Sequence, residues 1–230
     1  MQIITECNLA QIVSELLNGK TLVFPTETSY GLGCDATNQE AVDRIFKIKG
    51  RRNNKPLLVV VPTVEMARRY VMWNELLEKI ASKYWPGAVT VVGEYLSLRA
   101  KRSNLPVMAI GSESRGIATS PDANRAPRND TLVAGVVSQD NTLAIRVTAH
   151  PLLKSITEKL GRPLVATSGN IADTGDIYTA AEIIAQFENR EVQPDIILNY
   201  GELPRHKPTT IVSAVSSKLE IIRQGEVVVQ

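Results

Sequence analysis

Apolar residues in this chain recur with two different spacings. From residue 39 to residue 49 they repeat every three or four positions, which predicts a helix that begins after Asn38 and ends at Gly50. The run Leu-Leu-Val-Val-Val at residues 57–61 is rich in β-branched residues and lies between two prolines, which is typical of a strand buried on both faces. Helical and strand patterns therefore occur in the same chain.

The two patterns alternate through most of the 230 residues. Further helices are expected at residues 9–17, 64–70, 75–84, 151–160 and 180–187. Further strands are expected at residues 21–24, 88–92, 142–147, 164–166, 196–198, 210–212 and 220–222. This order predicts an α/β fold, with a twisted, mixed, open sheet and flanking helices in a single domain over residues 1–230. It leaves the order of the strands open.

Residues 94–139 break this alternation. They show no sustained period, and their polar stretches are rich in Ser, Arg, Asn and Pro. Six Lys and Arg against four Asp and Glu give the segment a charge of +2, which equals the net charge of the whole chain. A long segment without secondary structure inside a domain is usually a lid or an insertion. We interpret it as a disordered or loop insertion, and a basic arm that binds RNA is the alternative.

Composition narrows the class of protein. The 26 basic residues are nearly balanced by 24 acidic ones, which excludes a general nucleic-acid coat and leaves only a local patch for RNA. Cys7 and Cys34 have neither zinc-ligand nor redox spacing, which fits a reducing compartment. The N-terminus lacks the features of a signal peptide, and no apolar run is long enough to cross a membrane. We therefore expect a cytoplasmic protein without membrane association.

The first candidate for chemistry is the basic segment Lys-Gly-Arg-Arg-Asn-Asn-Lys-Pro at residues 49–56. It places four cations between the end of a predicted helix and a buried strand. Cations stabilise a helix C-terminus, which is one explanation for this density. The other is that they bind a triphosphate through charge-assisted hydrogen bonds, which are roughly twice as strong as neutral ones. The pattern alone leaves both explanations open.

The second candidate is Pro-Leu-Val-Ala-Thr-Ser-Gly-Asn at residues 163–170. It places small hydroxyl side chains just past the carboxyl end of a predicted strand, where α/β folds usually bind ligands. Gly169 would let backbone amides approach an anion. Ser, Gly and Asn are also ordinary turn residues, so a plain turn explains the segment as well.

The third candidate is Phe-Pro-Thr-Glu-Thr-Ser-Tyr-Gly-Leu-Gly-Cys-Asp at residues 24–35, which we expect to be a loop after residue 24. Glu27 is a candidate base. Alternatively, Thr26 and Thr28 form hydrogen bonds within a turn while Tyr30 packs. The spacing does not match the two-histidine, triad or nucleophile-elbow patterns of hydrolytic enzymes.

Taken together, these clusters resemble a known family. Seven segments occur in the order found in the YrdC-like threonylcarbamoyl-AMP synthases, and they are FPTETSYGLGCD, KGRRNNKPL, YWPGAVTVV, LAIRVTAHPLL, PLVATSGN, KPTTIVSA and IIRQG. The resemblance covers nearly the whole chain except residues 94–139. The chain ends soon after IIRQG, as in the short bacterial form without an additional C-terminal domain. Hydrogenase maturation proteins contain a similar domain, but in longer chains with zinc-finger-like cysteines.

The resemblance implies a single domain with a concave basic pocket and assigns residues to it. Lys49 and Arg51, the K-x-R pair, are implied to be catalytic. The implied ATP-binding residues are Lys49, Arg51, Lys55, Thr167, Ser168, Asn170, Thr209 and Arg223. The implied threonine-binding residues are Thr26, Tyr30 and Arg146. No protein residue is expected to bind the metal, because Mg²⁺ would be held mainly by the ATP phosphates.

The implied activity is that of a nucleotidyltransferase. It forms threonylcarbamoyl-AMP and pyrophosphate from L-threonine, bicarbonate and ATP with Mg²⁺, for the modification of tRNA. Implied partners are downstream threonylcarbamoyl-transferase proteins and tRNA, with direct binding of double-stranded RNA or tRNA as an open question. A non-catalytic RNA-binding protein of the same fold is the alternative. The chain departs from the family's pattern at two places. Val60 stands where many longer relatives have a histidine, and Thr209-Thr210 stands where a Ser-Thr pair is common.

Overall fold

A computed structural model of the protein describes residues 1–51, 55–96, 131–216 and 218–230. The helices are α1 (Leu9–Leu17), α2 (Gln39–Lys49), α3 (Val64–Ala67), α4 (Glu75–Tyr84), α6 (Pro151–Leu160) and α7 (Ala180–Phe187). The strands are β1 (Gln2–Ile4), β2 (Leu22–Pro25), β3 (Tyr30–Gly33), β4 (Val59–Val61), β5 (Val89–Glu94), β6 (Thr142–Val147), β7 (Leu164–Val165), β8 (Thr167–Ser168), β9 (Ile196–Leu198), β10 (Thr210–Ser213) and β11 (Glu220–Arg223). The α/β class predicted from the sequence is confirmed.

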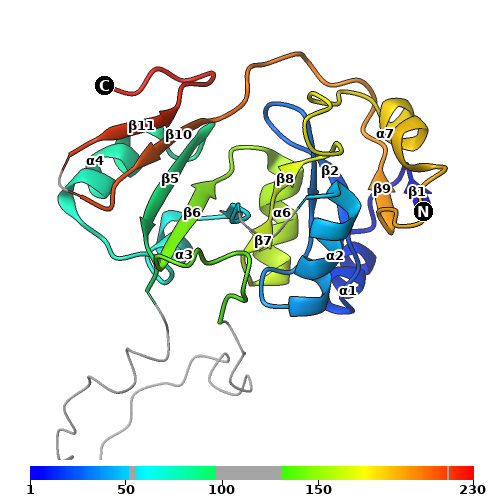
Figure 1. Ribbon diagram of the computed structural model, residues 1–230, viewed down its shortest axis with the longest axis horizontal. Coiled ribbons are helices and arrows are strands. Elements are labelled where there is room, and N and C mark those ends of the chain that lie inside the picture. Colours follow the sequence, from blue (N-terminus) through cyan, green and yellow to red (C-terminus); the bar gives the residue numbers. More distant parts are fainter. Residues whose placement is uncertain (52–54, 97–130, 217) are drawn as a thin grey trace, which may run out of the picture.

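The strands form two mixed sheets rather than the one open sheet that we expected. The first has the order β1-β9-β2-β3-β8 and the second β11-β10-β5-β6-β4-β7 (Figure 1). β4 pairs with β6 in parallel and with β7 antiparallel, so it is an interior strand. The strand predicted at residues 164–166 is observed as β7, and the chain then continues into β8, which the sequence analysis did not predict and which belongs to the first sheet. This crossing places two hydroxyl side chains, of Thr167 and Ser168, beside both sheets.

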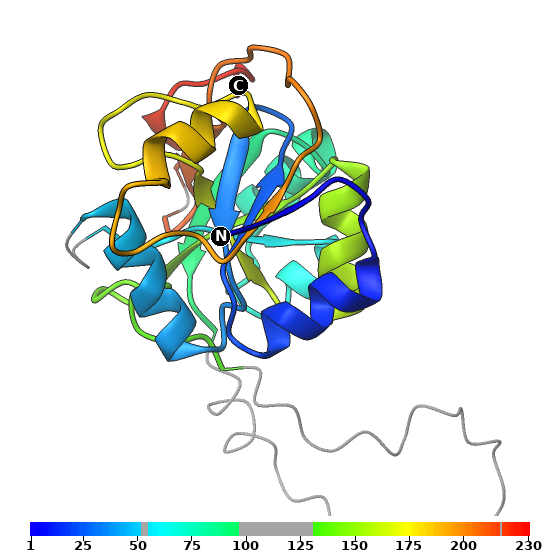
Figure 2. The same cartoon turned by 90° about the vertical axis from the view of Figure 1, so that its right-hand side faces the viewer.

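The helices cover the sheets with the faces that their apolar spacing predicts. α1 lies beside α6, and Ile12 and Leu16 of α1 belong to the same buried cluster as Leu153 and Ile156 of α6 (Figure 2). α2 begins at Asn38, whose side chain accepts a hydrogen bond from the amide of Ala41, and Gly50 ends it in the left-handed conformation. Both ends match the prediction.

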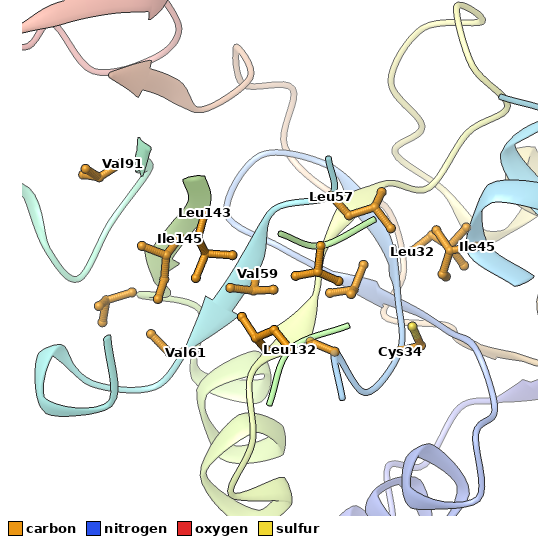
Figure 3. Close-up of a cluster of buried hydrophobic side chains, with 14 of the residues drawn as sticks. Leu32, Cys34, Ile45, Leu57, Val59, Val61, Val91, Leu132, Leu143 and Ile145 are labelled. Carbon is orange, nitrogen blue, oxygen red and sulfur yellow. The ribbon is translucent and has the colours of Figure 1, made fainter. Parts of the chain in front are cut away.

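The main core lies around β4, where residues 57–61 meet both neighbouring strands. Val59, Val61 and Ile145 are almost completely buried against one another, and Leu57 packs toward β3 and α2 (Figure 3). Burying an aliphatic side chain of this size contributes about 1.5–3 kcal/mol, so this cluster stabilises the centre of the fold. The prediction that this strand is buried on both faces is confirmed.

β3 was missed by the sequence analysis, which expected a loop there. Its Tyr-Gly-Leu-Gly sequence has no alternation of apolar and polar residues. Gly33 is nevertheless required: a Cβ atom at this position would lie 1.8 Å from the Val165 carbonyl oxygen. The glycines that hide the strand in the sequence let it approach the neighbouring backbone.

The described ends of residues 94–139 belong to the fold. Glu94 completes β5, and Tyr95, Leu132 and Val136 are buried in the main core. The Tyr95 hydroxyl accepts a hydrogen bond of 3.3 Å from the amide of Leu132, which joins the two ends. Residues 97–130, which carry the basic side chains of this segment, lie outside the described residues. Their interpretation as an insertion or an RNA-binding arm stays a prediction. Among the described residues, no helix has the length and apolar character needed to cross a membrane.

Candidate active site

A cavity of about 300 Å³ is lined by residues from both sheets. β3 and β8 of the first sheet contribute to one side of it, and β6, β10 and β11 of the second sheet contribute to the other. The segment after β9, orange in Figure 1, crosses from the first sheet to β10 and brings Pro208 and Thr209 to the cavity. The described lining contains three arginines and one carboxylate, and these are Arg51, Arg146, Arg223 and Asp176.

The structure brings most of the predicted site residues to this cavity. Those in its lining are Thr26, Tyr30, Arg51, Arg146, Thr167, Ser168, Thr209 and Arg223. Lys49, Lys55 and Asn170 are not in the lining. Asp176 also lines the cavity, although the sequence analysis assigned it no role, and Glu27 contacts Arg146 from outside the lining. Asp176 follows the loop after Asn170, a position that no spacing signal marks.

Lys49 lies behind the cavity wall rather than in a solvent-lined pocket as expected. Only 2% of the residue is exposed, and its ammonium donates hydrogen bonds to the carbonyl oxygens of Ser168 at 2.7 Å and Asn170 at 2.8 Å. The same nitrogen lies 3.3 Å from Ser168 Oγ and 3.2 Å from Asn170 Oδ1. Burial, and next the charge of Arg51, lowers the pKa of Lys49 to about 8. Lys49 therefore holds the segment that carries Ser168 against α2.

The segment around Ser168 is fixed by its backbone as well. The Gly169 amide donates a hydrogen bond of 2.8 Å to the Tyr30 carbonyl oxygen, so it is not directed at an anion as we expected. The Asn170 side-chain amide donates to the carbonyl of Gly175, which explains why Asn170 is buried and outside the lining. Thr167 and Ser168 are thus the hydroxyl-bearing members of this motif that line the cavity.

Arg51 and Arg223 line the part of the cavity near the ends of α2 and β11. The Arg51 guanidinium donates to the Lys55 carbonyl oxygen at 3.0 Å and lies 5.6 Å from the centre of the Phe46 ring. Its Nε atom is buried without a hydrogen-bond partner. Arg223 donates to the Thr209 carbonyl oxygen at 2.8 Å. Lys55 itself is exposed, and Arg52 lies outside the described residues.

Arg146 occupies the opposite part of the cavity at the end of β6. It is 3% exposed, and its Nη1 atom donates to a carboxylate oxygen of Glu27 at 2.7 Å. Its Nε atom is buried and has no hydrogen-bond partner. Arg146 also lines the cavity, so its positive charge would attract an anionic group bound there. The ion pair with Glu27 holds Nη1 from the other side.

Thr26 and Tyr30 shape the turn between β2 and β3. Thr26 Oγ1 donates to the Ser29 carbonyl oxygen at 2.7 Å and accepts from the amides of Thr28 and Ser29. The Tyr30 hydroxyl donates to the Gly201 carbonyl oxygen at 2.8 Å and accepts from the Tyr200 amide at 2.9 Å. Burial raises the pKa of Tyr30. The turn interpretation of these residues is confirmed, and Tyr30 also fastens the segment after β9 to the cavity.

Comparison with protein families decides the relationship. The family model Sua5/YciO/YrdC, described as telomere recombination, matches residues 14–122 and 123–225. The chain belongs to the Sua5/YciO/YrdC family. The resemblance seen in the sequence is therefore confirmed.

Curated relatives of this family match along nearly their whole length. A protein of Aliivibrio fischeri named threonylcarbamoyl-AMP synthase is 28% identical over 222 residues, which cover 95% of this chain and 99% of the relative. A protein of the same name from Vibrio vulnificus is 29% identical over 223 residues, with 95% and 98% covered. The similarity to these relatives thus extends over 95% of the chain.

Solved structures of the Sua5/YciO/YrdC family share the fold. P. abyssi Sua5, solved in complex with L-threonine, gives a TM-score of 0.75 at 23% identity. That match covers 97% of this chain but only 57% of the P. abyssi chain. E. coli YciO gives a TM-score of 0.70 at 20% identity, with 97% and 93% covered. Full-length HypF gives a TM-score of 0.69 at 18% identity, and the match covers only 29% of the HypF chain.

Proposed function

We propose that this protein is a nucleotidyltransferase that forms threonylcarbamoyl-AMP and pyrophosphate from L-threonine, bicarbonate and ATP. Full-length similarity to proteins named threonylcarbamoyl-AMP synthase supports the proposal. The observation that carries it is the cavity itself, which is lined by the cationic side chains of Arg51, Arg146 and Arg223. Cations on different elements suit a substrate pair with two anionic groups.

The three arginines suit the two substrates. Arg146, beside Thr26 in the lining, would bind the carboxylate of threonine, for which a guanidinium offers two parallel donors. Arg51 and Arg223 would bind the phosphates of ATP next to Ser168 and Thr209. Lys49 would act through Ser168, whose position it fixes.

The reaction follows from this arrangement. The amine of threonine combines with bicarbonate to give N-carboxythreonine and water. An oxygen of that carbamate attacks the α-phosphorus of ATP in line; the new oxygen–phosphorus bond forms while the bond to the bridging oxygen breaks, and pyrophosphate leaves. Negative charge builds on phosphate oxygens, and Arg51 would stabilise it in a site that limits the access of water. No covalent bond to the enzyme is needed.

Magnesium fits this donor set as a partner of the triphosphate. Among the residues that the structure describes, no group of three His, Cys, Asp or Glu side chains could hold a metal ion. Mg²⁺ keeps several waters and commonly binds through one or two carboxylates together with substrate phosphates. Asp176 is the carboxylate in the described lining that would hold it, and the ion would neutralise part of the phosphate charge.

The proposal includes the setting of the reaction. The product would pass to threonylcarbamoyl-transferase proteins for attachment to tRNA, in the cytoplasm, where the unpaired thiols of Cys7 and Cys34 remain reduced. The RNA-binding alternative is less well supported by residues 49–55 than it was from sequence. Lys49 is buried and Arg51 lines the cavity, so neither forms an exposed basic stripe.

One experiment tests the proposed function. The protein is incubated with ATP, magnesium, threonine and labelled bicarbonate, and the adenylate is identified by mass. We expect a labelled product and pyrophosphate only when all four are present. Arg69→Ala, an exposed arginine outside the cavity lining, is the matched control for Arg51→Ala. Pyrophosphate release that does not depend on threonine, or RNA affinity without turnover, would contradict the proposal.

A further inference from the structure

Glu27 lies in the turn between β2 and β3, and its carboxylate joins three parts of the fold. It accepts hydrogen bonds from Arg146 Nη1 at 2.7 Å and from the Thr148 hydroxyl at 2.7 Å. It also accepts from the amides of Ala149 at 2.6 Å and His150 at 3.2 Å, immediately before α6. One side chain thus connects the turn, the end of β6 and the start of a helix.

These contacts argue against the role of catalytic base that the sequence analysis considered for Glu27. Each carboxylate oxygen already accepts at least one charge-assisted or backbone hydrogen bond, and Glu27 is absent from the cavity lining, whereas Arg146 is present. Burial alone would raise the pKa of Glu27, but the charge of Arg146 and the hydrogen bonds from Thr148 and Ala149 outweigh it and hold the pKa below its usual value. The group therefore remains an ionised acceptor behind the arginine.

The orientation of Arg146 depends on this acceptor. Arg146 is 3% exposed, and its ion pair with Glu27 fixes the guanidinium in the wall of the cavity. With Nη1 held from behind, Arg146 still lines the cavity and presents its charge to it. The start of α6 adds backbone donors to the same carboxylate, which keeps Glu27 itself in place.

We propose that Glu27 is the positioning residue of the amino-acid subsite, which orients Arg146 toward the carboxylate of threonine. This inference rests on the proposed function and deepens it. Glu27 acts through Arg146 and does not contact the substrate. Since Arg51 and Arg223 donate their hydrogen bonds to Lys55 and Thr209, we expect the loss of Glu27 to lower the affinity for threonine and to leave the affinity for ATP unchanged.

The test compares Glu27→Gln and Glu27→Asp with the wild type. Glu158→Gln is the matched control, since Glu158 forms an exposed ion pair with Lys154 on α6. The measurements are KM for threonine, KM for ATP, kcat and Tm. We expect Glu27→Gln to raise KM for threonine about 10-fold or more with KM for ATP unchanged, because it removes the charge of a buried pair. Glu27→Asp, which keeps the charge, should recover part of the loss.

Other outcomes distinguish a failure of the proposed function from a failure of the positioning role of Glu27. Wild-type protein without threonine-dependent release of pyrophosphate contradicts the proposed function. Active wild type, together with a Glu27→Gln variant whose KM for threonine is unchanged, overturns the positioning role. A parallel rise of both KM values with a fall in Tm also overturns it, because it shows a general structural role. If Glu27→Gln does not fold, Glu27→Asp and Thr148→Val decide, and both should raise KM for threonine selectively.

Discussion

The two sides of the cavity hold their arginines in different ways. Arg146 is 3% exposed and is held by a carboxylate that three further donors fix in place. Arg51 is half-buried and Arg223 is exposed, and they donate hydrogen bonds to oxygens of Lys55 and Thr209. The proposed amino-acid side, around Arg146, is therefore set before a substrate arrives, whereas the proposed nucleotide side, around Arg51 and Arg223, depends more on neutral carbonyl partners.

This difference has an energetic meaning. A donor that is already oriented loses little conformational entropy when it binds its ligand, whereas an exposed side chain costs about 0.5–1.5 kcal/mol to immobilise. Threonine is small and offers few contacts, so it benefits most from a site formed in advance. ATP offers many phosphate oxygens, which tolerate more freedom in the side chains that bind them.

The substitution with the largest expected effect is Arg146→Ala. It removes the proposed carboxylate partner and leaves Glu27 buried without its cation, a change that typically costs about 2–5 kcal/mol. We expect kcat/KM for threonine to fall about 100-fold or more. Steady-state release of pyrophosphate at varied threonine measures this. A variant with less than about a 3-fold loss would remove Arg146 from the amino-acid subsite.

Lys49→Met should lower the free energy of unfolding, because Lys49 holds the segment of Ser168 from behind the cavity wall. The carbonyls of Ser168 and Asn170 would lose their charged donor, and the free energy of unfolding should fall by about 2–4 kcal/mol. Urea denaturation measures this, with exposed Lys47→Met on the same helix as the control. Equal midpoints for the two variants would show that these hydrogen bonds contribute nothing.

Arg51→Ala should separate the nucleotide side from the amino-acid side. It removes a half-buried cation from the lining, so KM for ATP should rise about 10-fold while the midpoint of unfolding hardly changes. KM for threonine should stay near the wild-type value. If both KM values rise together, the two sides are not independent and the comparison above is wrong.

A further prediction is a pH dependence of stability that comes from Lys49. Its pKa is about 8 in the folded protein against a usual 10.5, because burial disfavours the ammonium form. Between pH 8 and pH 10.5 the unfolded chain binds more protons at Lys49 than the folded protein does, so the contribution of Lys49 to stability rises with pH. Below pH 8 the side chain is charged in both states, and the full cost of burying its charge lowers stability. The difference in unfolding free energy between wild type and Lys49→Met should therefore shift in favour of wild type from pH 7 to pH 10. A constant difference would contradict the lowered pKa.

Much of the fold could be predicted because its elements follow local rules. α2, α4 and β6 have the bounds predicted from apolar spacing and capping residues. β3 could not be predicted, since the reason for Gly33 is the Val165 backbone more than a hundred positions away in sequence. The division into two sheets depends on similar long-range pairing, which no local pattern contains.

The sequence predicted most of the residues that line the cavity but not the contacts that hold them in place. The family resemblance assigned Arg51, Arg146 and Ser168 to one pocket, and the structure brings all three to one cavity. Sequence did not reveal that Lys49 faces two carbonyls from behind the wall. Nor did it reveal that Glu27 accepts from Arg146, since 119 positions separate the two residues. Such assignments need the tertiary structure.

The most direct test is a crystal structure of the protein with threonine and a non-hydrolysable ATP analogue. We predict that the threonine carboxylate accepts hydrogen bonds from Arg146, with Nη1 still bound to Glu27, and that the phosphates lie beside Arg51 and Ser168. A threonine carboxylate bound away from Arg146, or phosphates bound outside this cavity, would contradict the account.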